Sequence, residues 1–155
     1  RQYAQVGQRL ATAVFAGDAE AVKAVLAPLL RRYVSVRDAA TKAPAENYYH
    51  GFLSAMFACA GSAVVNFHSN AEAGDGFADL VFTSADQTTG VVVEIKRCEK
   101  RQAMPEAATA AVRQIKDRHY VEGLDGYGCR EVWAYGIAFS GKSCLVSGER
   151  LVPEK

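Results

Sequence analysis

The sequence predicts an α/β (α+β) fold in which helices flank one mixed central sheet. Apolar residues recur at helical spacing through the first sixty positions, short β-rich runs follow, and a last helix and two more strands complete the chain. The chain has 155 residues, of which 50% are hydrophobic. That is enough to form a core without disulfides or structural metal.

The first third of the chain predicts three helices. Residues 2–16 carry apolar side chains on one helical face, and Asp18 is an N-cap residue for a second helix that reaches Tyr33. A loop is expected over residues 35–45, and a third helix over residues 46–60.

The pattern then changes to strands. Residues 63–68 suit a strand, and residues 69–76 are rich in turn-forming Asn, Asp and Gly. Strands over residues 77–83 and 91–97 are separated by a polar turn and can form a hairpin. The chain then predicts a helix from Pro105 to about Gly123 and strands over 130–139 and 143–147.

Composition excludes several classes of protein. No apolar run approaches the ~20 residues of a membrane span, and the four cysteines form no C-x-x-C pair of the kind that holds structural zinc. We therefore expect a protein that does not enter a membrane and works in the reducing cytoplasm. The net charge of +1 does not by itself indicate nucleic-acid binding, although residues 37–94 are acidic and residues 95–142 are basic.

Two carboxylates lie inside apolar strands, where an unpaired charge is unfavourable. Glu94 and Lys96 point to the same face of their strand, roughly 7 Å apart at their Cα atoms, while Ile95 points to the opposite face. If the two strands pair, Asp79 can meet Glu94, and hard carboxylate oxygens suit Mg²⁺ or Mn²⁺. The alternative is a structural ion pair between Glu94 and Lys96, but the preceding run of valines favours a buried site.

Asp79, fourteen intervening residues and Glu94-Ile95-Lys96 resemble the PD-(D/E)XK nuclease superfamily. The similarity is closer to the C-terminal nuclease-like domain that follows an AAA-ATPase-like domain in many bacterial proteins. It spans roughly residues 44–148 and is carried by the segments Glu46–Gly51, Gly74-x-Gly76-x-x-Asp79, Val93–Lys96, Ala111–Ile115 with Tyr120, and Gly136–Phe139 before Lys142.

The resemblance implies a restriction-endonuclease-like core over residues 44–155, with residues 1–43 as a helical extension that packs on it or links to it. It implies a nuclease that acts on DNA, with an AAA-ATPase-like domain as a partner in the full-length protein. Asp79, Glu94 and the backbone carbonyl of Ile95 would hold Mg²⁺ or Mn²⁺.

The resemblance also implies roles for residues around these ligands. Lys96 would serve the attacking water and the scissile phosphate, Glu46 would assist at a metal-bound water or a second ion, and Gln114 would reach in from the following helix. Further residues expected beside the site or the substrate are His50, Tyr120 and Arg118. His50 could instead hydrogen-bond within the helix packing, and Tyr120 could stack a base, support Gln114 or simply pack.

One departure and two rival interpretations stay open. Phe77 stands where the family often carries an arginine, and Asp75 adds negative charge to the same loop. The first rival is a catalytically inactive nuclease-fold module that binds nucleic acid or protein. The second is a P-loop NTPase, because residues 136–143 match G-x-x-x-x-G-K-[ST]; the apolar residues that follow favour a strand over the required helix.

Overall fold

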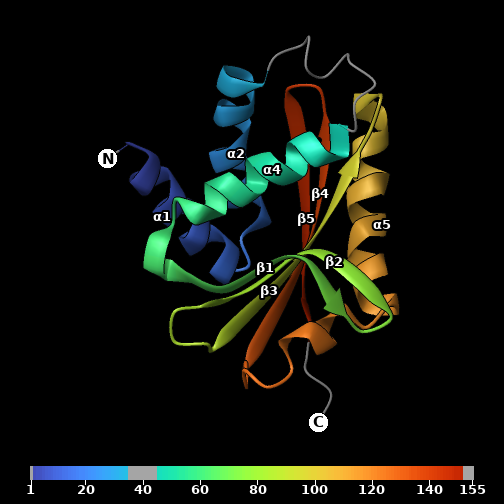
Figure 1. Ribbon diagram of the computed structural model, residues 1–155. Coiled ribbons are helices and arrows are strands. Elements are labelled where there is room, and N and C mark those ends of the chain that lie inside the picture. The colour runs from blue at the N-terminus through green and yellow to red at the C-terminus, as the bar shows by residue number, and fades with distance from the viewer. Residues whose placement is uncertain (1, 35–44, 152–155) are drawn as a thin grey trace.

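The computed structural model describes residues 2–34 and 45–151, with side chains from residue 47 in the second range (Figure 1). Its helices are α1 (Gln2–Phe15), α2 (Ala19–Tyr33), α4 (Ala45–Ala58) and α5 (Met104–Asp117), with 3-10 turns η1 (Gly61–Ala63), η2 (Arg101–Ala103) and η3 (Tyr120–Leu124). The expected cap at the start of α2 is present, because the Ala21 amide donates to the Asp18 carboxylate at 3.0 Å. The loop expected before α4 falls outside the described residues except for its last position.

Five strands form one sheet in the order β1-β2-β3-β4-β5. Every neighbouring pair is antiparallel except β3 and β4, which are parallel and are connected through α5. The predicted mixed sheet flanked by helices is therefore confirmed. The strands are β1 (Val64–Ala73), β2 (Gly76–Ser84), β3 (Thr89–Arg97), β4 (Glu131–Ser140) and β5 (Ser143–Leu151).

Three expected boundaries are wrong. The last strand, expected over residues 143–147, continues to Leu151. The turn expected over residues 69–76 shrinks to a tight turn at Gly74 and Asp75, because β1 continues to Ala73. The pairing of β1 with β2 is irregular between Val65 and His68, where Asn66 adopts a positive φ. The expected helix to Gly123 ends at Asp117 instead. His119, at φ 54°, turns the chain into η3.

Helices cover both faces of the sheet. On one face, α1, α2 and α4 bury Leu10, Leu26 and Leu53 in a cluster that includes Ile95 and Tyr135. On the other face, α5 and η3 pack on the sheet through a second cluster, which contains Val112 and Ile115 together with Val92 and Ala134. The N-terminal helices thus lie against the sheet, while the division of the chain at residue 43 stays a prediction.

A strand glycine brings α5 unusually close to the sheet. Gly136 lies beside Glu94 in the parallel β3–β4 ladder. A Cβ at this position would overlap the Ala108 carbonyl oxygen of α5 and come within 2.8 Å of the Ala111 Cβ atom. The missing side chain therefore lets α5 lie directly over the face of β3 that carries Glu94.

The phosphate-loop pattern of residues 136–143 lies in the β4–β5 hairpin, with a turn at Gly141 and Lys142. A nucleotide-binding loop must lead into a helix N-terminus, and here it leads into β5. The structure therefore gives no support to the P-loop NTPase interpretation. No helix among residues 2–34 and 45–151 is long and apolar enough to cross a membrane.

We expect the wild-type protein and Lys142→Ala to show no ATP binding at micromolar concentrations, because the lysine is not part of a phosphate-binding helix start. Calorimetric titration of ATP with Mg²⁺ measures this directly. Micromolar binding that is lost in the variant would restore the NTPase interpretation.

Candidate active site

The candidate site begins where β2 and β3 separate. Their ladder ends at the pair Leu80 and Val93, one position before Asp79 would face Glu94. Asp79 instead bridges the two strands with its side chain, because its Oδ2 accepts the Ile95 amide hydrogen at 2.7 Å. The carboxylate of Asp79 is thereby held at the backbone of the segment that carries Glu94 and Lys96.

Glu94 is almost fully buried on the α5 face of the sheet, with 6% of its surface exposed. Its Oε1 accepts a hydrogen bond from Gln114 Nε2 at 3.3 Å. Its Oε2 is buried and has no hydrogen-bond partner among the described residues. A buried acceptor without a partner is unfavourable unless something else, such as a cation, satisfies it.

The surroundings of Glu94 disfavour its charged form. Burial, followed by the negative charge of Asp79, raises the pKa of Glu94 to about 8, and the nearby Lys96 opposes this only in part. The charged forms of Glu94 and Asp79 therefore repel each other. This is the behaviour expected of two carboxylates that share a cation site.

Gln114 connects the remaining polar groups. Its Oε1 accepts from Lys96 Nζ at 2.8 Å, and its Nε2 donates both to Glu94 and to the Tyr120 hydroxyl at 3.2 Å. One amide from α5 therefore sets the positions of Glu94 and Lys96 together. Tyr120 is only 1% exposed, so it supports Gln114 and does not offer its ring to a base.

His50 lies on α4 and contacts the backbone of the site. Its Nε2 is 3.1 Å from the Asp79 carbonyl oxygen and 3.5 Å from Ser69 Oγ. Ser69, on β1, is a neighbour that the sequence did not indicate. Glu46 lies one helical turn before His50 in α4, but its side chain lies outside the described residues.

Arg118 is exposed at the end of α5. Its carbonyl accepts the Asp75 amide at 2.9 Å, and its guanidinium lies near Gly76 at the start of β2. Phe77, which occupies the position where the resemblance implied an arginine, is 65% exposed beside this loop. A cation thus lies next to the glycine loop, although it comes from α5 and not from the loop itself.

The residues present fit a hard divalent cation. Asp79 and Glu94 contribute carboxylates from adjacent strands, and the unpartnered Glu94 Oε2 is an acceptor that a cation would satisfy. Within the described part of the chain, no group of three or more His, Cys, Asp or Glu side chains could hold a metal. Other oxygens near this pair, such as the Ile95 carbonyl and water, could complete the coordination.

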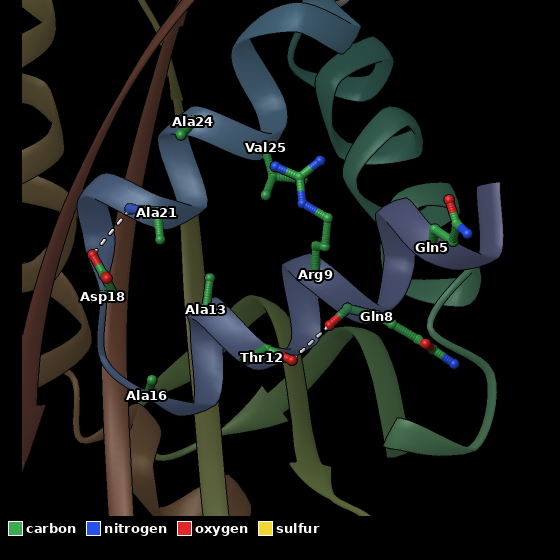
Figure 2. A pocket seen from close by; sticks show the side chains of 10 residues that line it. All are labelled: Gln5, Gln8, Arg9, Thr12, Ala13, Ala16, Asp18, Ala21, Ala24 and Val25. Atoms are coloured by element: carbon green, nitrogen blue, oxygen red, sulfur yellow. Dashed lines mark hydrogen bonds between the residues drawn. The ribbon is translucent and has the colours of Figure 1, made fainter. Parts of the chain in front are cut away.

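Another groove on the described surface lies away from this site. Figure 2 shows this groove, of about 630 Å³, between α1 and α2, lined mainly by alanines and by polar residues such as Gln8, Arg9 and Asp18. Asp18 already caps α2, and Thr12 donates to the Gln8 carbonyl at 2.9 Å. The groove contains none of the converging polar groups of the β2–β3 site.

The raised pKa of Glu94 predicts how the metal-free protein responds to pH. From the ordinary range of a carboxyl group up to about pH 8, the folded state holds a proton that the unfolded state has released. The free energy of unfolding therefore falls as pH rises through this window. Glu94→Gln removes the titration, so in chelator it should be more stable than wild type by about 2 kcal/mol near pH 8.5 and lose this advantage near pH 5.

Thermal melts of both proteins in chelator across this pH range measure the difference. Glu99→Gln, on the exposed segment after β3, is the matched control and should follow the wild type. Parallel pH profiles for Glu94→Gln and wild type would show that Glu94 is not the titrating group.

A family model described as the PD-(D/E)XK nuclease superfamily matches residues 44–149, more than half of the chain. The matched range contains all the helices and strands from α4 through β4, and these elements carry the candidate site. No curated protein matches the sequence.

Proposed function

Because the chain belongs to the PD-(D/E)XK nuclease superfamily, we propose that it is a metal-dependent nuclease that hydrolyses phosphodiester bonds, with DNA as the substrate. The observation that carries the proposal is the convergence of Asp79, Glu94, Lys96 and Gln114 at the open end of the β2–β3 ladder. A structural ion pair between Glu94 and Lys96 would not need a second carboxylate that bridges the strands or an amide that links the pair.

Asp79, Glu94 and the Ile95 carbonyl would hold Mg²⁺ or Mn²⁺ there, with Glu46 as a further ligand to the ion or its water. When bound, such a cation lowers the pKa of a coordinated water and stabilises negative charge on phosphate. Asp79 keeps its carboxylate at β3 through the Ile95 amide, and His50 holds the Asp79 backbone. These contacts orient the ligands before substrate arrives.

Lys96 supplies positive charge beside the carboxylates. Its ammonium group donates a hydrogen bond to Gln114 Oε1, so the lysine is positioned before the reaction begins. The ammonium can donate a hydrogen bond to the attacking water and to a phosphate oxygen as charge develops on it. Tyr120 and Glu94 fix Gln114 from its other side, and Arg118 would contact the substrate beyond the loop at Gly76.

The rival proposal is an inactive nuclease-fold module. Phe77 favours it, because the loop at Gly74 and Gly76 then has no cation of its own. The polar network argues against it, because Gln114 is hydrogen-bonded to both Lys96 and Glu94 in a partly buried setting. A module that only bound a partner would gain nothing from an unpartnered buried carboxylate oxygen.

The experiment that tests the function uses end-labelled and circular DNA, single-stranded DNA and RNA, each with Mg²⁺, Mn²⁺ or chelator. We expect cleavage of DNA that requires metal and stops in chelator. Equal cleavage of RNA would change the substrate, and the absence of metal-dependent cleavage on every substrate would favour the inactive module. Circular DNA distinguishes internal cleavage from cleavage at ends.

A further inference from the structure

A second cavity, of about 510 Å³, is lined by positive charge. Four cationic side chains from separate parts of the chain meet there: Lys23 and Arg31 from α2, Arg101 from η2 and Lys142 from the β4–β5 turn. No acidic side chain is among the residues that line it. The cavity therefore concentrates positive charge in a chain whose net charge is only +1.

The described neighbours do not neutralise these cations. None of the four takes part in a salt bridge within residues 2–34 and 47–151. Lys142 Nζ donates to the Arg31 carbonyl at 3.5 Å, which holds it over the last turn of α2 without cancelling its charge. Like charges gathered in this way repel one another, and an anion relieves the repulsion.

The buried thiol of Cys144, which lines the cavity, is affected by the positive charge of the cavity. Burial raises the pKa of Cys144 to about 11, and the charges of Lys23 and Arg31 oppose that rise. Lys23 and Arg31 therefore lie close enough to this thiol, which also lines the cavity, to affect its pKa.

The cavity lies at the same end of the sheet as the candidate active site. Lys96 is beside Ala138 in the parallel β3–β4 ladder, and Lys142 follows in the turn where β4 ends. Arg101 comes five residues after Lys96. In Figure 1 the end of α2, the β4–β5 turn and the start of α5 lie together at this end of the molecule.

We propose that this basic cavity binds backbone phosphates of a nucleic-acid strand that extends beyond the scissile phosphate, an inference that rests on the proposed nuclease function. Arginine and lysine side chains commonly contact backbone phosphates and position a strand without reading its sequence. Lys142, the lysine of the false nucleotide-binding pattern, thereby contacts phosphate as part of a surface cavity and not as part of a helix start.

The test measures binding of a fluorescent DNA oligonucleotide in chelator, by anisotropy, at several salt concentrations. The variant Arg101→Gln/Lys142→Gln removes two cavity charges. The control Arg113→Gln/Arg130→Gln removes two exposed arginines of α5 and the segment before β4. We expect the cavity variant to bind about tenfold more weakly, with a salt slope smaller by about 1.5, since each lost phosphate contact contributes about 0.7–0.9. The control should change neither quantity comparably.

A second variant, Lys23→Gln/Arg101→Gln, keeps the Lys142 contact to α2 and should show the same loss; melting curves establish that each variant is folded. Equal losses in the cavity and control variants, or none, would overturn the cavity proposal. Micromolar displacement of the oligonucleotide by AMP or inorganic phosphate would also overturn it, because the cavity would then be a small-anion site.

The outcomes separate this inference from the nuclease proposal. If the wild type cleaves DNA but the cavity variants bind it as the wild type does, only the cavity proposal is wrong. If binding depends on the cavity but no metal supports cleavage, only the nuclease proposal is wrong. A wild type that binds no DNA at any salt concentration would contradict both.

Discussion

Glu94→Ala is expected to lose at least ~10³-fold in the rate of DNA cleavage, because the substitution removes a direct ligand of the metal. It also removes the acceptor of Gln114 Nε2, so the amide that positions Lys96 loses one of its anchors. The measurement is the initial rate of Mn²⁺-dependent cleavage of labelled DNA at saturating metal.

The matched control is Glu99→Ala, which removes a carboxylate from the exposed segment just after β3 and should cleave at the wild-type rate. Glu94→Ala also removes an unsatisfied buried oxygen, so the variant should remain folded in chelator. A folded Glu94→Ala protein that cleaves at the wild-type rate would show that the metal is bound elsewhere.

Lys96→Ala is expected to lose ~10²-fold or more in cleavage rate while keeping its metal affinity within a few fold. The lysine contacts Gln114, not the carboxylate oxygens, so its removal affects the water and the phosphate more than the ligands. Single-turnover cleavage and calorimetric Mn²⁺ titration together measure the two effects.

Lys100→Ala, a similar change on the exposed chain after β3, controls for the loss of one positive charge near the substrate. Loss of Mn²⁺ binding in Lys96→Ala would contradict the role given to the lysine. A rate loss that disappears at saturating DNA would show that Lys96 only binds substrate.

Local patterns predicted most of this fold correctly. The Asp18 cap, the apolar stripes of the helices and the strand spacing each depend on residues close in the chain, and each is present. The wrong boundaries of β1 and α5 depend on backbone conformations that the residue types alone do not predict. Asn66 adopts a positive φ where the pairing of β1 is irregular, and His119 adopts a left-handed conformation between α5 and η3.

The site could be predicted only in part, because some of its contacts depend on where strand pairing ends and on which elements meet in the folded chain. The spacing of Asp79, Glu94 and Lys96 indicates a cluster because strand pairing brings the first two together. The contact of Asp79 with the Ile95 amide requires the ladder to end one pair earlier, and the alternation of side chains along the strands does not predict where a ladder ends. The sequence did not indicate the basic cavity, because its cations come from α2, η2 and the β4–β5 turn, which meet only after folding.

The central claim is that Asp79 and Glu94 hold one cation beside Lys96. Anomalous diffraction from crystals soaked in Mn²⁺, recorded at the manganese absorption edge, tests it most directly. The account predicts a peak within coordination distance of Glu94 Oε2 and of the Asp79 carboxylate, and its loss in Glu94→Ala crystals. A peak at any other site, or one that survives in Glu94→Ala, would contradict it.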